Sequence, residues 1–122
     1  MGKNKDVAVA FLRSVTSGQI RDAYKTYVSD DFRHHNSYFR GDAESLMRGM
    51  EENEAQFPGK ELEVKHALED GEFVAVHSRL QLEPGKVVAV VHLMRFSDGL
   101  IVEMWDVGQP LPAESQNENG PF

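Results

Sequence analysis

The sequence predicts a single small α+β domain in which three helices precede a four-stranded antiparallel sheet. Before Gly59, apolar residues recur with the 3.6-residue period of amphipathic helices. After Gly59, they alternate with the two-residue period of half-buried strands, and turn sequences separate one run from the next. Helices followed by a run of strands are typical of α+β domains with the helices packed on one face of the sheet.

The helical pattern covers residues 7–15, 20–28 and 42–56, with a brief extended segment at residues 32–36. Gly18 ends the first pattern. Asp42 is a suitable N-cap for the third helix, because its carboxylate can accept from free backbone N–H groups. Phe57-Pro58-Gly59 ends that helix, since proline cannot continue the hydrogen-bond ladder.

Four alternating runs follow, at residues 62–69, 72–82, 87–96 and 100–109. Asp70-Gly71 is a strong two-residue hairpin signal between the first two runs. Turn sequences at residues 83–86 and 97–99 separate the others, so the runs predict an antiparallel meander.

At 122 residues the chain has the usual size of one domain, which we place at residues 1–110. Residues 111–122 form a polar tail whose composition cannot bury enough apolar surface to order itself. The tail ends on Phe122, an apolar residue. It is either part of a frayed end, or a ring that packs into a groove near the cavity mouth or on a partner subunit.

The composition argues against several classes of function. A net charge of −7 argues against nucleic acid as a partner, because phosphate binding needs clustered Lys and Arg. The longest apolar run, residues 87–93, is too short to cross a membrane. There is no cysteine for thiol chemistry, and no signal-peptide segment follows the N-terminus, so we expect a cytoplasmic protein.

Two ionisable residues lie on apolar faces of adjacent predicted strands. His92 shares a face with Val90, Met94 and Phe96, and Asp106 shares one with Val102 and Met104. Carboxylates are disfavoured in strands and costly to bury. A carboxylate that faces a pocket, away from water, would be an effective proton acceptor.

Plainer interpretations remain open at this point. Asp106 could face solvent or form a hydrogen bond with a neighbouring loop. His92 could be a hydrogen-bonded core residue. The face occupied by His77 is not determined. His34 and His35 are adjacent on an extended segment and point to opposite sides, so we expect no metal site there.

Four segments carry a family likeness: Phe-Arg-His-His-Asn at residues 32–36, and residues 74–78, 91–96 and 98–107. Together they resemble the SnoaL-like polyketide cyclases of the nuclear transport factor 2-like superfamily, over roughly the whole chain. The resemblance implies a cone-shaped, curved, cystatin-like sheet wrapped around the helices and enclosing one apolar pocket. It also implies a homodimer through the outer sheet face, with Asp106 as general base and His35 and His92 at the cavity.

The leading hypothesis is therefore an enzyme that transfers a proton alpha to a carbonyl, by aldol cyclisation or isomerisation, without a cofactor. The expected ligand is small, apolar and carbonyl-containing. Asp106, His92 and His35 are the candidate catalytic residues, and the candidate substrate-binding residues are Trp105, Met104, Met94, Phe96, His77 and Tyr24. The alternative is a dimeric binding module without catalysis. An epoxide hydrolase ranks last, because Arg95 points away from His92.

Overall fold

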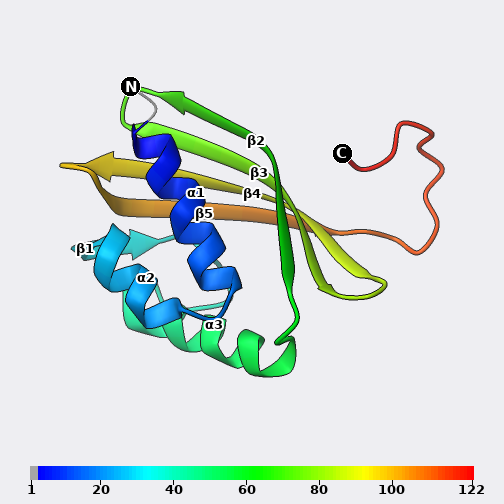
Figure 1. Cartoon of the computed structure of the whole chain (residues 1–122), viewed down its shortest axis with the longest axis horizontal. Helices are drawn as coiled ribbons and strands as arrows, with labels where there is room; N and C mark the ends of the chain where they lie inside the picture. Colours follow the sequence, from blue (N-terminus) through cyan, green and yellow to red (C-terminus); the bar gives the residue numbers. More distant parts are fainter. Residues whose placement is uncertain (1–2) are drawn as a thin grey trace.

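The computed structural model describes residues 3–122 and has the predicted α+β architecture (Figure 1). Its elements in chain order are α1 (Lys3–Thr16), α2 (Ile20–Tyr27), β1 (Val28–His34), α3 (Ala43–Gln56), β2 (Glu61–Asp70), β3 (Phe73–Glu83), β4 (Lys86–Ser97) and β5 (Leu100–Pro110). The strand order in the sheet is β1-β5-β4-β3-β2. The meander from β2 to β5 is thus confirmed, and the sheet is curved but not closed.

One strand more than predicted belongs to the sheet. The second helix ends at Tyr27, and Val28 begins β1, which pairs parallel with β5. Val28 lies opposite Ile101, and His34 lies opposite Met104. Because this pairing joins segments about seventy residues apart, no local pattern in the sequence distinguishes β1 from a connecting loop.

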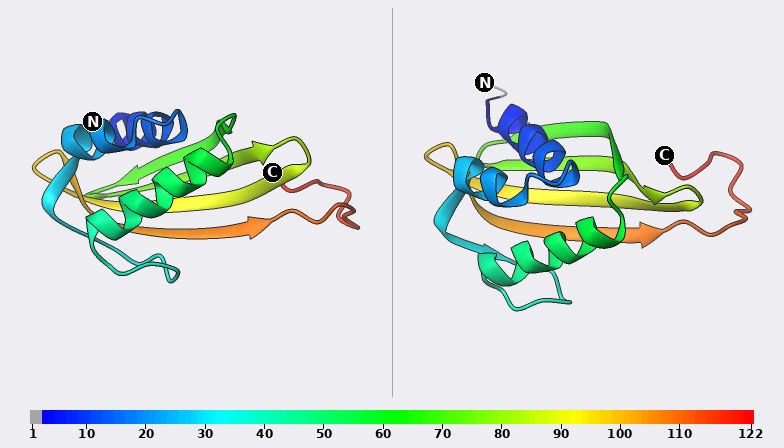
Figure 2. Two further views of the ribbon diagram at one scale, coloured as in Figure 1. Left: turned by 90° about the horizontal axis from the view of Figure 1, so that it is seen from below. Right: turned by 60° about the horizontal axis from the view of Figure 1, so that its bottom comes forward.

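The helices build one side of the domain (Figures 1 and 2). Helix α1 crosses one face of the sheet, and α2 and α3 lie toward the edge formed by β1 and β5. In the core, the rings of Phe11 and Tyr24 meet edge to face at 5.3 Å, and those of Tyr24 and Phe32 at 5.8 Å. The inward residues of β3, β4 and β5 complete this core: Val74, Val76, Met94, Phe96, Ile101 and Met104.

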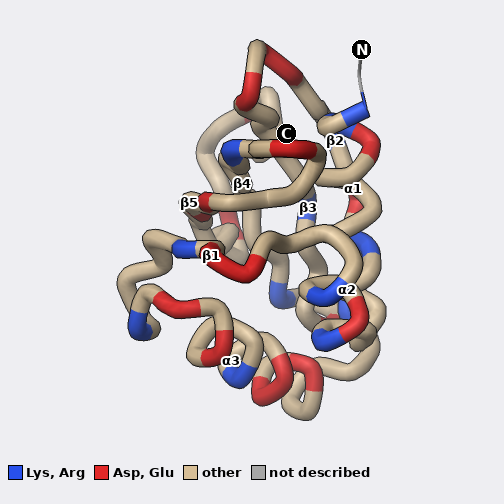
Figure 3. Tube along the Cα trace, turned by 90° about the vertical axis from the view of Figure 1, so that its left-hand side faces the viewer, with Lys and Arg blue, Asp and Glu red and all other residues tan. Residues whose placement is uncertain are grey.

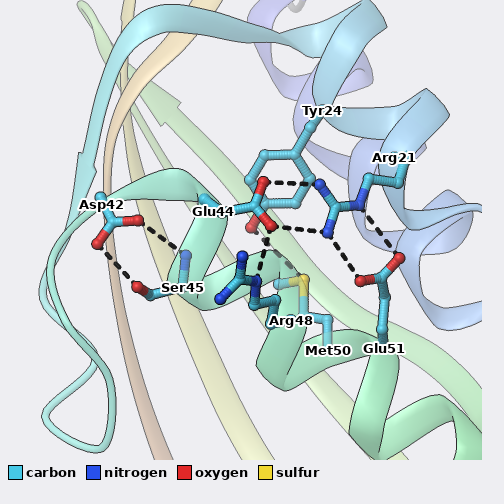
Figure 4. A network of polar contacts seen from close by, with 8 residues as sticks. All are labelled: Arg21, Tyr24, Asp42, Glu44, Ser45, Arg48, Met50 and Glu51. Carbon is cyan, nitrogen blue, oxygen red and sulfur yellow. Dashed lines mark hydrogen bonds and ion pairs between the residues drawn. The ribbon is translucent and has the colours of Figure 1, made fainter.

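Polar contacts hold α3 beside α2 (Figure 4). Asp42 caps α3 as predicted, by accepting from the backbone N–H of Ser45 at 2.8 Å. The guanidinium of Arg21 bridges Glu44 and Glu51, at 2.7 and 2.9 Å. Helix α3 is mostly acidic, and Arg48 is its one basic residue (Figure 3). These pairs are solvent-exposed, so they orient α3 more than they stabilise the fold.

The hairpin between β4 and β5 contains a turn and a bulge. The turn predicted at residues 97–99 is present, and Asp98 and Gly99 both have positive φ, 53° and 78°, as a type I′ turn requires. Beyond the turn, Phe96 pairs with Ile101 but Arg95 pairs with Glu103, so Val102 is an extra residue in β5. As a result Ile101, rather than Val102, lies opposite Phe96 in the core.

The C-terminal tail turns back toward the sheet (Figure 1). The ring of Phe122 lies 5.9 Å from that of His77, and the Lys65 ammonium lies 5.5 Å from the same ring. Phe122 therefore packs on the outer sheet face and not near the cavity mouth. No helix within residues 3–122 is long and apolar enough to cross a membrane.

Candidate functional site

A cavity of about 300 Å³ lies between α1, α3 and the inner face of the sheet. Its wall is mostly apolar, and polar side chains interrupt it at a few points. The lining residues are Leu12, Val15, Thr16, Asn36, Phe39, Leu46, Gly49, Met50, Asn53, Lys60, Leu62, Leu80, His92 and Asp106. An apolar pocket with a few polar groups is the usual form of a small-molecule site.

The structure brings Asp106 and His92 together at this cavity. They are cross-strand partners on β5 and β4. Directly opposite residues of an antiparallel pair lie on the same face, with their Cβ atoms about 5 Å apart. Both side chains line the cavity, as their predicted positions on inward strand faces required.

Asp106 is held by one side-chain donor. The amide Nδ2 of Asn36 donates to Asp106 Oδ2 at 3.0 Å. Asn36 is itself fixed by its loop, since its Oδ1 accepts from the backbone N–H of Tyr38 and its own N–H donates to His34 Nδ1. Among residues 3–122, no hydrogen-bond donor reaches Asp106 Oδ1, so this oxygen can accept a proton.

His92 lies in the cavity wall, where burial favours the neutral imidazole. Burial lowers its pKa from the usual value of 6.5, and the negative charge of Asp106 opposes this effect only in part. Its Nδ1 is buried without a hydrogen-bond partner in the described part of the chain. A neutral imidazole carries one N–H donor and one acceptor, so His92 can donate one hydrogen bond to an oxygen.

Phe39 closes part of the cavity by packing against the backbone of α3. A Cβ placed on Gly49 would lie only 2.4 Å from the Phe39 ring. Glycine at this position therefore allows the ring to lie directly on the helix. The loop that supplies Asn36 to Asp106 thus also supplies an aromatic wall.

Several predicted substrate-binding residues lie in the core instead. Met94, Phe96 and Met104 face inward but are packed beneath α1 and α2, and they do not line the cavity. Tyr24 is also buried, with its hydroxyl 3.5 Å from the Sδ of Met50. Burial and the charge of Asp106 raise the Tyr24 pKa, which keeps the phenol protonated.

His35 and Trp105 lie on the outer face of the sheet, not at the cavity. Their rings stack at 4.9 Å, and His35 Nε2 lies 2.7 Å from Glu103 Oε2. The alternation of β5 explains this position, because Trp105 and Asp106 are adjacent and must point to opposite sides. His77 is on the outer face too, with its Nδ1 3.0 Å from His66 Nδ1.

Four polar cavity residues were missed as candidate site residues: Thr16, Asn36, Asn53 and Lys60. Asn36 follows the two histidines in a loop, and only its hydrogen bond to Asp106 distinguishes it from other loop residues. Lys60 follows a turn glycine, where a lysine is expected to face solvent. Within residues 3–122, no group of three or more His, Cys, Asp or Glu side chains is arranged to hold a metal ion.

Comparison with known proteins gives a family match and a set of structural relatives. Residues 8–104 match the SnoaL-like domain. AclR from Streptomyces galilaeus, a proposed hydroxylase, superposes with a TM-score of 0.78 and 22% identity, over 89% of this chain and 90% of that one. No curated protein matches by sequence.

Two further solved structures show the same fold. IdmH from Streptomyces antibioticus, a proposed polyketide cyclase, has a TM-score of 0.72 and 18% identity, over 86% of this chain and 91% of that one. A nuclear transport factor 2-like protein from Cytophaga hutchinsonii has a TM-score of 0.70 and 19% identity, over 87% and 89%. Identities this low establish the architecture and leave the chemistry to the site.

Proposed function

Because the chain belongs to the SnoaL-like family, we propose that it is an enzyme that removes a proton alpha to a carbonyl of a small substrate. The product would arise by intramolecular aldol cyclisation or by isomerisation. The observation that carries this proposal is that Asp106 and His92, a base and a neutral donor, line one apolar cavity. The proposed polyketide cyclase among the relatives agrees with this class of reaction.

The proposed reaction begins when Asp106 Oδ1 accepts the proton from the α-carbon. The electron pair of the broken C–H bond moves onto the carbonyl oxygen, and the enolate oxygen accepts a hydrogen bond from the His92 imidazole. Donors aimed at a developing oxyanion are effective in a site that excludes water. In the cyclisation, the enolate carbon attacks a second carbonyl of the same molecule, and Asp106 returns the proton to the new alkoxide.

No cofactor is needed in this scheme, because the carbonyl itself delocalises the charge. Asn36 holds Asp106 Oδ2, so the carboxylate presents Oδ1 to the substrate. The cavity lies at the lower end of the range typical for ligands, about 300–1,000 Å³. A substrate with a compact apolar body fits this volume.

We also propose that two copies associate through the outer sheet face. Four apolar residues are exposed on this face: Leu68, Phe73, Val91 and Val107. Val91 and Val107 are cross-strand partners in the middle of it, and Val107 has 72% of its surface exposed. Several exposed apolar residues on one sheet face are consistent with an interface there.

Proton transfer can be tested without the natural substrate. The probe is 2-tetralone, an apolar ketone whose α-protons exchange with D₂O at a rate measurable by proton NMR. Wild-type protein should accelerate the exchange. Asp106→Asn keeps the shape of the side chain but removes the base, and it should lower the catalysed rate by about 10²- to 10⁴-fold.

Glu103→Gln is the matched control, because it also neutralises a β5 carboxylate but on the opposite face. It should leave the catalysed exchange rate within a few-fold of wild type. Equal rates for wild type and Asp106→Asn would contradict the proposal. If 2-tetralone binds but its exchange is not accelerated, the chain is better described as a binding module.

A further inference from the structure

Lys60 is a buried cation in the cavity wall. Its side chain is only 6% exposed, and it lies immediately before β2, at the sheet edge away from β5. Its ammonium donates to Glu54 Oε1 at 2.9 Å. Lysines are almost never buried to this degree unless they are paired, so Glu54 explains part of this arrangement.

The pairing with Glu54 leaves most of the ammonium unused. An ammonium carries three N–H donors. Glu54 takes one of them, and the described residues provide no hydrogen-bond acceptor for the other two. Donors buried without an acceptor are costly, which points to an oxygen-bearing ligand on the cavity side of Lys60.

A second hollow adjoins the cavity at the same residue. Its volume is about 210 Å³, and it is lined by Arg13, Thr16, Ser17, Lys60 and Leu62. Thr16, Lys60 and Leu62 line both spaces, so the two meet there. Arg13 forms no ion pair within residues 3–122. In a protein with a net charge of −7, the second hollow thus has, among the described residues, an unpaired cation, Arg13, beside the Lys60–Glu54 pair.

Lys60 and Asp106 lie at opposite ends of the cavity. Strand β2 is separated from β5 by β3 and β4, which places the two strands on the order of 14 Å apart. The charged lining residues are thus a cation on the β2 side and an anion on the β5 side. A ligand that matches this polarity has an acidic group at one end and a neutral carbonyl at the other.

We propose that Lys60 binds a carboxylate of the substrate, so that the cavity selects keto acids with an apolar body over neutral ketones. The placement of the ketone at Asp106 rests on the function proposed above. The carboxylate site does not, because its occupancy can be measured by binding alone. Failure of proton transfer and failure of acid binding are therefore separate results.

The experiment compares naphthalene-2-carboxylate with its methyl ester, two probes of the same ring system. Binding to the full chain is measured by isothermal titration calorimetry at pH 7.5. Wild-type protein should bind the acid about tenfold more tightly than the ester, since hydrogen bonds to charged groups are the stronger ones. Lys60→Met should remove this preference and leave the affinity for the ester within twofold.

Three further variants separate recognition from a structural role. Glu54→Gln removes the internal competitor for Lys60, so it should strengthen binding of the acid several-fold and leave the ester unchanged. Lys60→Arg keeps the charge and should keep the preference. Lys65→Met is the matched control, because Lys65 pairs with Glu63 at 2.8 Å but lies outside the cavity.

The proposal is overturned if wild-type protein shows no preference for the acid. It is also overturned if Lys60→Met leaves the preference intact, which would place the acid elsewhere. If Lys60→Met fails to fold, the ratio of acid to ester affinity in Glu54→Gln decides between a binding role and a structural role for Lys60. An unchanged ratio of acid to ester affinity in that variant, with a lowered melting temperature, would assign the pair a purely structural role.

Discussion

Glu103 and Asp106 are carboxylates three residues apart on β5, and they are held in opposite ways. Glu103, on the outer face, lies within 2.9 Å of Arg33 Nε, 2.7 Å of His35 Nε2 and 3.1 Å of Arg95 Nε. These hydrogen bonds, from Arg33 first, lower the pKa of Glu103 to about 2. Asp106, on the inner face, receives a single amide hydrogen bond.

This difference separates a structural carboxylate from one available for chemistry. A carboxylate that accepts from several cations is stabilised as an anion and has no reason to accept a proton. One that keeps an oxygen free beside an apolar cavity can exchange a proton with a substrate. The number of donors around each group therefore indicates its role better than its residue type.

After Asp106→Asn, the largest effect is expected from His92→Leu, also on the inner face. Loss of the imidazole donor should lower the catalysed exchange of 2-tetralone by about 10²- to 10³-fold, as for other oxyanion donors. Folding should not suffer, because the change removes a buried nitrogen that has no partner. A loss of exchange smaller than threefold would exclude His92 as the donor.

The same variant has a defined effect on acid stability. The folded pKa of His92 lies below its unfolded value of 6.5, so the unfolded chain binds this proton first as the pH falls. Wild-type stability should therefore decrease below about pH 6.5. In His92→Leu, the free energy of unfolding measured with urea should decrease less between pH 7 and pH 5 than it does in wild type.

A smaller effect is expected from Asn36→Ala. This change removes the donor that orients Asp106, and it should lower the exchange rate by about tenfold, in line with the value of one hydrogen bond to a charged group. Asn53→Ala is the matched control, because Asn53 lines the same cavity without contacting Asp106. Equal losses in the two variants would show that cavity shape matters and Asn36 does not.

On the outer face, Glu103→Gln should change stability and leave catalysis unaffected. The folded pKa of about 2 lies below the usual 4.5, so the stabilisation is complete above pH 4.5 and is lost as the pH falls toward 2. The variant should melt several degrees below wild type at pH 7, and the two curves should converge near pH 2. Thermal melts across this range check the prediction.

The smallest effect on a single subunit is expected from Val107→Lys. The side chain is already exposed, so the melting temperature of the monomer should hardly change. A charge at the centre of the proposed interface should nevertheless weaken self-association. Sedimentation velocity of wild type and variant at matched concentrations measures this, and identical sedimentation would place the interface elsewhere.

The sequence predicts this fold well because its signals are local. The change of period at Gly59, the Asp42 cap and the turn glycines each act within a few residues, and all three are present in the structure. The pairing of β1 with β5 is not local. It depends on distant segments meeting in the folded chain. The sequence alone therefore predicted only a short extended segment at residues 32–36.

The site was predicted only in part, for a related reason. Alternation indicated which residues of a strand share a face, and so it placed His92 and Asp106 inward. It could not distinguish an inward residue of the cavity from one of the core, as with Met94. That distinction depends on how far α1 and α3 stand from the sheet, and the same distance decides that Lys60 is buried.

The bulge at Val102 determines which chemistry β5 offers to the cavity. Strict alternation from Ile101 would turn Trp105 inward and Asp106 outward. Because Val102 is an extra residue, the alternation of inward and outward side chains shifts by one position there. Ile101 and Asp106 therefore both face inward. Deleting Val102 would remove the bulge and would still leave Ile101 and Asp106 facing inward.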